Sequence, residues 1–169
     1  MLSITSAKSD NLKRYIDVLE EAAEWLNSRG LGQVPASLYR QSVAYFSDSI
    51  ERGEVHLAFI DGHIVATLRL LSQDRIVWPE ADHDALYVHN LVVCRAWRGR
   101  GLGRQMLDWA EQQTAIAAKR HLRLDCFASN GILRKYYEQA GFVGRGEVDA
   151  QYPFGILRLQ RYEKEVRRK

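Results

Sequence analysis

The spacing of hydrophobic residues predicts one short strand and two helices in the first third of the chain. Leu2 and Ile4 alternate with polar residues, as in a strand. Ser9-Asp10 then offers an N-cap for a helix whose apolar positions recur at helical spacing, namely Leu12, Tyr15, Ile16, Leu19, Ala22, Ala23 and Leu26. Gly30 and Gly32 end this helix, and after Pro35 a second helix is predicted from the positions of Leu38, Val43, Phe46 and Ile50.

A β-hairpin is predicted in residues 55–71. Two β-rich runs, 55–60 and 64–71, flank Asp61-Gly62-His63, and an Asp-Gly pair favours a tight hairpin turn. A polar segment that contains Asp74, Trp78, Glu80, Asp82 and Asp84 then leads into a third strand, from Ala85 to Val93.

The rest of the chain predicts a strand-helix-strand unit, a further helix and two strands. Apolar residues recur at helical spacing from Leu102 to Lys119, and residues 121–127 alternate as a strand. A short helix from Asn130 to Ala140 stops at Gly141, and strands are expected over 142–147 and 154–162. The predicted order is strand, two helices, three strands, helix, strand, helix and two strands, which is a mixed α/β arrangement.

Length and composition indicate a single globular domain that covers residues 1–169. The chain is 46% hydrophobic with three prolines, and it shows no biased run that would mark a linker or a repeat. No export signal and no apolar stretch long enough to span a bilayer is expected. Cys94 and Cys126 lack Cys-x-x-Cys spacing, so neither a disulfide framework nor a metal site is predicted, and a reducing cytoplasm is the expected location.

The net charge of +3 is concentrated in one place. Arg95, Arg98, Arg100 and Arg104 lie within ten residues that contain no carboxylate. A compact basic cluster in a glycine-rich loop favours a small anionic ligand, whereas nucleic-acid binders spread basic residues along a whole face. Neither a nucleic-acid partner nor a membrane is therefore expected, and the basic C-terminal residues after Glu163 are expected to form a solvated tail.

The sequence from Arg98 to Arg104, Arg-Gly-Arg-Gly-Leu-Gly-Arg, lies where a strand is predicted to turn into a helix. Glycines leave the first helical N–H groups unobstructed, and the helix dipole and flanking arginines attract phosphate. A P-loop would need a lysine, and no lysine lies between Lys13 and Lys119. A Rossmann turn would need a third glycine where Arg104 stands. The predicted ligand is therefore a pyrophosphate held in a different kind of loop.

The remaining pattern, Arg-x-x-Gly-x-Gly at Arg98, Gly101 and Gly103, resembles the coenzyme A loop of the GCN5-related N-acetyltransferase (GNAT) superfamily. The family's other signature parts follow in order: a strand that ends at Val93, the loop, a helix, a strand, and a helix that closes with Tyr137-Glu138-Gln139-Ala140-Gly141-Phe142. The match is close over residues 87–142. The N-terminal third, which sets substrate choice in the family, agrees only in its predicted order of elements.

This resemblance implies a fold and a co-substrate. The expected fold is a mostly antiparallel twisted sheet of six or seven strands, splayed between the fourth and fifth, with about four helices. The expected co-substrate is acetyl-CoA, without a metal. In the family the pantetheine arm lies like an added strand beside the strand before the loop. The implied cofactor-binding residues are Leu91, Val92, Val93, Arg98, Gly99, Arg100, Gly101, Leu102, Gly103, Arg104, Asn130 and Tyr137, with the N–H of Val92 as a candidate to polarise the thioester carbonyl.

The resemblance also implies that Tyr137 protonates the leaving thiolate, a step that suits a phenol with a pKa of about 10. Leu133, Tyr136, Tyr137 and Ala140 share one helical face, so either tyrosine could instead belong to the core. We expect Tyr136 to pack and Tyr137 to act. Asn130 matches an asparagine that contacts pantetheine in the family, and its alternative role is the N-cap of the helix.

His89 is the expected general base. On simple alternation it shares a face with Leu91, where some arylalkylamine acetyltransferases carry a catalytic histidine, and a pKa near neutrality suits the task. A lone histidine in a strand is more often a hydrogen-bonded structural residue, and Asp125 is the second choice.

The expected acceptor-binding residues are Trp25, Trp78, Tyr87 and Asp125. Trp25, Trp78 and the acidic segment fall where this fold binds its acceptor, and carboxylates beside an indole suit a cationic amine. The alternative is that the acidic segment is only solvated and that the tryptophans belong to the core.

The predicted function is transfer of an acetyl group from acetyl-CoA to a primary amine of a small molecule, by direct attack in a ternary complex. A covalent acyl-enzyme on Cys94 or Cys126 is not expected, because no neighbouring base is evident. A protein or peptide N-acetyltransferase and a non-catalytic CoA-binding sensor are the alternatives, and a homodimer is left open.

Overall fold

The computed structural model describes residues 1–32, 34–80 and 83–166; Asp82 and the last three basic residues lie outside these ranges. Within them it has seven strands: β1 (Ser3–Ser6), β2 (Val55–Ile60), β3 (His63–Leu71), β4 (Ala85–Val93), β5 (His121–Phe127), β6 (Val143–Tyr152) and β7 (Gly155–Glu165). The α-helices of the described residues are α1 (Leu12–Ser28), α2 (Ser37–Gln41), α3 (Val43–Glu51), α4 (Leu102–Ile116) and α5 (Gly131–Gln139). Short 3-10 helices, Ser9–Asn11 and Arg95–Trp97, precede α1 and follow β4.

The strands are hydrogen-bonded in the order β1-β2-β3-β4-β5-β7-β6. The β1–β2, β2–β3, β5–β7 and β6–β7 pairs are antiparallel, whereas β4 and β5 run parallel. The β4–β5 register extends from Ala85↔His121 to Val88↔Leu124, although both strands continue beyond it. This ending of the parallel ladder is the splay expected between the fourth and fifth strands, and the expected mixed fold is confirmed.

The predicted order of elements is confirmed with one difference, because the second helix is divided at Ser42. Ser42 has φ −102° and ψ 26°, and its N–H bonds to the carbonyl of Tyr39, three residues back. Serine competes with the backbone for hydrogen bonds, so it favours such breaks. The predicted hairpin is confirmed: Asp61 (φ 50°) and Gly62 (φ 76°) both adopt the left-handed backbone that a two-residue turn of this kind requires.

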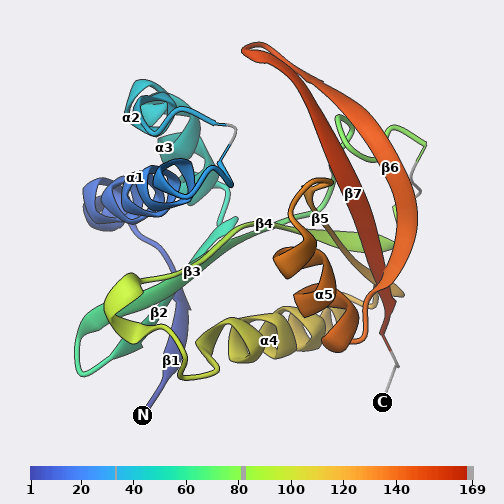
Figure 1. The fold of residues 1–169 in the computed structure, drawn as a ribbon. Coiled ribbons are helices and arrows are strands. Elements are labelled where there is room, and N and C mark those ends of the chain that lie inside the picture. Colours follow the sequence, from blue (N-terminus) through green and yellow to red (C-terminus); the bar gives the residue numbers. More distant parts are fainter. Residues whose placement is uncertain (33, 81–82, 167–169) are drawn as a thin grey trace. The chain divides into compact units, whose positions relative to one another are not determined.

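The chain consists of two compact units. The first contains Met1–Arg69 and Asn90–Met106. In it α1 packs against α2 and α3 (Figure 1). Its core brings together Tyr15, Ile16 and Leu19 of α1, Phe46 and Ile50 of α3, and Val55 and Leu57 of β2. These are the positions that helical spacing and strand alternation predicted to be apolar.

The second unit contains Leu70–His89 and Leu107–Lys169. The strands β6 and β7 form a long curved hairpin (Figure 1), and β7 also pairs with β5. Its core includes Val77 and Trp78 of the segment between β3 and β4, Ala85 and Tyr87 of β4, and Ala150 and Leu159 of the hairpin. The polar segment before β4 is thus anchored by apolar side chains at its centre.

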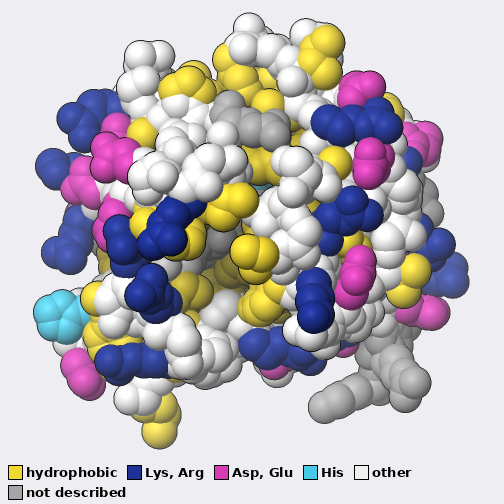
Figure 2. Space-filling model, viewed as in Figure 1, with side chains coloured by type: hydrophobic (Ala, Val, Ile, Leu, Met, Phe, Trp, Pro, Cys, Tyr) yellow, Lys and Arg dark blue, Asp and Glu magenta, His cyan; other side chains and the backbone are white. Residues whose placement is uncertain are grey.

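Figure 2 shows one face of the molecule, on which several groups of Lys and Arg side chains have Asp and Glu side chains nearby. None of the described helices combines the length and the apolar composition that crossing a bilayer requires.

Candidate active site

The glycine-rich loop lies between the 3-10 helix Arg95–Trp97 and the start of α4 at Leu102. Gly99 (φ 75°) and Gly101 (φ 70°) adopt left-handed backbone conformations, which side chains disfavour, and a Cβ at either would meet no atom within 4 Å. Gly103 lies in the first turn of α4. The first amide groups of the helix therefore begin in a glycine-rich, open turn, which fits the binding of a phosphate group.

The arginines of this region are exposed. The Arg100 guanidinium lies 4.6 Å from the centre of the Trp97 ring, and that of Arg95 lies 5.6 Å from the Trp25 ring. Among the described residues, neither Arg98 nor Arg100 forms an ion pair with a carboxylate. Positive charge is thus available beside the helix N-terminus, as a diphosphate requires.

Trp25, which was expected to bind the acceptor, lies near two guanidinium groups of the first unit. The Arg29 guanidinium lies 5.7 Å from the centre of the Trp25 ring, and the buried Trp25 Nε1 has no hydrogen-bond partner among the described residues. The ring therefore packs beside the turn that precedes the glycine loop.

The strand before the loop departs from regular geometry at Asn90, which has φ 50°. Asparagine tolerates this left-handed conformation better than most residues, and such a residue within a strand changes the direction of the side chains that follow. Simple alternation therefore does not place His89 and Leu91 on one face, contrary to the expectation. Leu91, Val92 and Val93 are half-buried.

Tyr137 is the buried tyrosine of α5, with 7% of its surface exposed. Its ring lies 5.5 Å from that of Tyr136, 6.1 Å from Phe142 and 5.9 Å from Tyr162, measured between centroids. Burial, reinforced by the nearby Cys126 and Asp125, raises the pKa of the Tyr137 phenol above its usual value. Tyr136 was expected to be the core residue of the pair, but it is only half-buried, and Tyr137 is the more buried of the two.

Asn130 is the N-cap of α5. Its Oδ1 accepts a hydrogen bond of 3.1 Å from the N–H of Leu133, and the residue is buried. This is the capping role given above as the alternative to a pantetheine contact.

His89, Asp74 and Asp125 come together in the second unit. One potential ligand atom from each of the three side chains lies within 4.8 Å of those of the other two. His89 Nε2 and Asp74 Oδ2 are 2.9 Å apart, while Asp74 Oδ1 accepts hydrogen bonds from the N–H groups of Ile76 (3.2 Å) and Val77 (3.1 Å). Burial opposes ionisation of Asp74, but these bonds, first that of His89, hold its pKa below the usual range.

The pKa of the Asp125 carboxyl is shifted upward, in contrast to that of Asp74. Burial raises the pKa of its carboxyl to about 6; the charge of Asp74 acts in the same direction, and that of His89 opposes it. A carboxyl group that titrates near neutrality can take up and release protons under working conditions.

Tyr87 and Trp78 are structural members of the wall beside this cluster. Tyr87 is 1% and Trp78 is 6% exposed, and their ring centroids are 6.3 Å apart. The Tyr87 hydroxyl accepts a hydrogen bond of 3.0 Å from Arg123. The guanidinium groups of Arg123 and Arg161 lie 4.9 Å and 5.1 Å from the centre of the Trp78 ring. Both aromatic rings, which were expected to bind the acceptor, are enclosed by protein in this structure.

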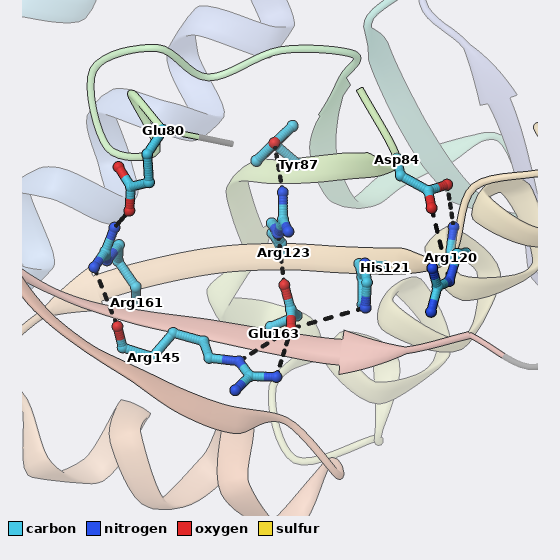
Figure 3. Close-up of polar contacts among 9 residues, drawn as sticks. All are labelled: Glu80, Asp84, Tyr87, Arg120, His121, Arg123, Arg145, Arg161 and Glu163. Atoms are coloured by element: carbon cyan, nitrogen blue, oxygen red, sulfur yellow. Dashed lines mark hydrogen bonds and ion pairs between the residues drawn. The ribbon is translucent and has the colours of Figure 1, made fainter. Parts of the chain in front are cut away.

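The arginines that hold Trp78 belong to a larger network (Figure 3). Glu163 accepts hydrogen bonds from Arg123 (2.7 Å) and Arg145 (2.7 and 3.0 Å), and His121 lies 3.9 Å away. Arg161 bonds to Glu80 and to the Arg145 carbonyl. Sequence reasoning missed this network, although alternation within β5 places Arg123 and Asp125 on one face, which was a usable signal.

Comparisons with known proteins concern the family and the fold of the chain. The family model described as Acetyltransferase (GNAT) family matches residues 18–142. The uncharacterized N-acetyltransferase YesJ of Bacillus subtilis is 34% identical over 134 residues, which are 76% of this chain and 74% of YesJ. A GNAT-family acetyltransferase from Listeria monocytogenes superposes with a TM-score of 0.80 at 26% identity, over 97% of this chain and 94% of its own.

The structure of yncA from Salmonella typhimurium with its cofactor acetyl-CoA has the same fold, with a TM-score of 0.68 at 14% identity over 100% of this chain and 96% of that one. The family match covers most of the chain and includes the glycine loop. The chain therefore belongs to the acetyltransferase (GNAT) family and is an acetyl-CoA-dependent N-acetyltransferase.

Proposed function

We propose that the protein transfers the acetyl group of acetyl-CoA directly to a primary amine of a small molecule. The observation that carries the proposal is the start of α4, where Gly99 and Gly101 hold an open turn beside the exposed side chains of Arg98 and Arg100. In this proposal residues 1–169 act as one catalytic domain, located in the cytoplasm.

The residues proposed to hold acetyl-CoA are those that the family resemblance implies. They are Leu91, Val92 and Val93 for the pantetheine arm, and Arg98, Gly99, Arg100, Gly101, Leu102, Gly103 and Arg104 for the pyrophosphate. Asn130 and Tyr137 are proposed as further contacts. Acetyl-CoA supplies the reactive thioester, and the protein's groups bind it, orient it and handle protons.

Tyr137 is proposed as the group that gives a proton to the leaving sulfur. Burial raises the pKa of this phenol above its usual value, so it is protonated near neutrality and the proton is present when the thiolate departs. His89 is proposed as the base that acts on the acceptor, in contact with Asp74.

Direct transfer is favoured over an acyl-enzyme by the two thiols. Burial raises the pKa of Cys126 to about 12 and raises that of Cys94 above its usual value. A thiol of raised pKa is a poor nucleophile near neutrality, because the thiolate is the reactive form.

The test combines binding and turnover. Calorimetry with CoA should show binding to the wild-type protein, and thiol release from acetyl-CoA should increase when small primary amines are added. A His89→Ala variant should lose the acidic limb of the pH–rate profile; an unchanged profile would remove the base assignment. Binding of CoA without amine-dependent thiol release would instead support the sensor alternative, and the absence of CoA binding would refute the proposal.

A further inference from the structure

We propose that a groove in the first unit is a second binding site, that it takes a dipeptide with free ends, and that its occupation strengthens CoA binding. The groove has a volume of about 510 Å³, which is in the range of small-molecule pockets. Its walls are α1, the start of β3 and the turn between β4 and α4. The binding of the dipeptide does not depend on the proposed function, and only the effect on CoA rests on it.

The groove is separate from the residues proposed to hold acetyl-CoA. Of the described residues that line it, none belongs to residues 91–93 or 98–104. Cys94 and Trp97, which do line it, lie in the interval between these two segments. A ligand in the groove would therefore occupy a different place from the pyrophosphate, next to the turn from which the glycine loop starts.

The half-buried residues that line the groove are apolar and form its floor. They include Val18 of α1, Ile64 of β3 and Trp97. Cys94 attaches the turn to β3, because its N–H donates a hydrogen bond of 2.9 Å to the Val65 carbonyl and its thiol donates one of 3.4 Å to the Ile64 carbonyl. The floor therefore offers an apolar surface, held by the sheet, to the side chains of a ligand.

The α1 wall carries positive charge at one end and negative charge at the other. Arg14, Asp17 and Glu21 recur at helical spacing and line the groove from one face of the helix. Burial raises the pKa of the Cys94 thiol, the charge of Glu21 adds to this shift, and the charge of Arg14 opposes it. Both charges therefore act on the same part of the floor, where an ammonium and a carboxylate of one ligand can each find a partner.

The charged groups of this wall can exchange their present surroundings for a ligand. In the described part of the chain neither Arg14 nor Glu21 forms an ion pair. Asp17 pairs with Lys13 at 2.8 Å, but the two side chains are 47% and 85% exposed, and pairs in water contribute little. Asp17 and Glu21 are like charges four residues apart, which repel each other. An ammonium group shared between them relieves this repulsion, while the Arg14 guanidinium donates to a carboxylate.

The spacing of the charges favours a dipeptide over a single amino acid. The midpoint of Asp17 and Glu21 lies five residues from Arg14, which is about 7.5 Å along the helix axis. An amino acid carries its ammonium and its carboxylate on one carbon atom, whereas two extended residues span up to about 7 Å. A dipeptide with free ends therefore reaches both ends of the wall, and apolar side chains would lie on the floor.

Trp97 connects the groove with the proposed CoA loop. The residue lines the groove, and the Arg100 guanidinium lies 4.6 Å from the centre of its ring. The loop begins directly after it, at Arg98. A peptide that packs on the indole holds both the ring and the stacked Arg100 in place. CoA then meets a more ordered loop, so less conformational freedom is lost when CoA binds.

Calorimetry without CoA tests the site on the full chain. The probe is leucyl-alanine, and it is compared with N-acetyl-leucyl-alanine, which lacks the ammonium, leucyl-alaninamide, which lacks the carboxylate, and leucine. The proteins are the wild type, Arg14→Gln, Glu21→Gln and a matched control, Glu24→Gln. Glu24 is an exposed carboxylate of α1 that does not line the groove. All three substituted side chains are exposed, so the variants should fold, and thermal melts check this.

Leucyl-alanine should bind the wild type, and each of the other probes should bind about tenfold more weakly or less. Arg14→Gln and Glu21→Gln should each weaken leucyl-alanine binding about tenfold, whereas Glu24→Gln should bind it as the wild type does. The absence of leucyl-alanine binding, equal binding of a blocked probe, or an unchanged affinity in either groove variant would overturn the site. Leucine binding as tight as that of leucyl-alanine would overturn the dipeptide in favour of a free amino acid.

The effect on CoA is measured as CoA affinity with and without leucyl-alanine, at a peptide concentration that saturates only the wild type. The affinity should rise about fivefold in the wild type and should not change in Glu21→Gln. An unchanged CoA affinity in the wild type would overturn the coupling between the two sites. If CoA does not bind at all, the proposed function and the coupling fall together, whereas leucyl-alanine binding in the absence of CoA still decides whether the groove is a site.

Discussion

Glu163→Gln should destabilise the protein strongly, because it removes the buried carboxylate that forms an ion pair with the buried guanidinium of Arg123. Glu163 and Arg123 side chains are 8% and 9% exposed and are joined by a hydrogen bond of 2.7 Å (Figure 3). Arg145, the other donor, is 53% exposed, so its pair with Glu163 should contribute only about 0–1 kcal/mol. Breaking a buried pair costs about 3–5 kcal/mol, because the remaining charge stays desolvated.

The change in the free energy of unfolding should therefore be about 3–5 kcal/mol, a large part of the roughly 5–15 kcal/mol typical of a native protein. Urea denaturation followed by tryptophan fluorescence measures it, since Trp78 lies against Arg123. Glu147→Gln is the matched control, because that carboxylate is 34% exposed and pairs with the exposed Arg158.

A double variant tests whether the unpaired charge of Arg123 causes the destabilisation of Glu163→Gln. Arg123→Met combined with Glu163→Gln removes the stranded charge, so it should be less destabilised than the sum of the two single changes. The reasoning would be refuted if Glu163→Gln lowered the free energy of unfolding by less than about 1 kcal/mol. It would also be refuted if the effects of the two single changes on that free energy were fully additive in the double variant.

Three further outcomes are expected. Burial opposes ionisation of Glu163, but hydrogen bonds from Arg123 and Arg145 hold its pKa below the usual range; its stabilisation is therefore complete above the unfolded value of about 4.3 and is lost as pH falls through the folded value. Acid unfolding should be steeper in the wild type than in Glu163→Gln, and equal slopes would contradict this. Gly101 has φ 70°, so Gly101→Ala should introduce backbone strain of about 1–2 kcal/mol and weaken CoA binding about tenfold. Gly131→Ala is the control and should leave CoA binding unchanged. Calorimetry with CoA measures both affinities. Tyr137→Phe should lower kcat about a hundredfold or more at saturating acetyl-CoA; full turnover would remove the acid assignment.

Local sequence signals predicted the structure well at positions where the backbone conformation requires a particular type of residue. The Asp61-Gly62 turn and the glycine loop are examples, because both need left-handed backbone that few residues supply. The break at Ser42 and the positive φ of Asn90 were not predicted, since apolar spacing carries no information about a single residue that departs from regular geometry.

The candidate site was predicted in part. His89 and Asp125 were both named, and the structure brings them together, but Asp74 was seen only as one member of an acidic segment. Its position depends on the pairing of β4 with β5 and on the burial of Trp78, which are contacts between residues far apart in the sequence. For the same reason the sequence does not show that Trp78 and Tyr87 pack together in one core cluster.

The surroundings of the two cysteines have a practical consequence for work with this enzyme. Cys126 is buried, and the Cys94 thiol donates a hydrogen bond of 3.4 Å to the Ile64 carbonyl. Alkylating and oxidising reagents attack thiolates, which both side chains form reluctantly. Disulfide reagents that detect released CoA should therefore give a low protein background, and the enzyme should tolerate storage without reductant.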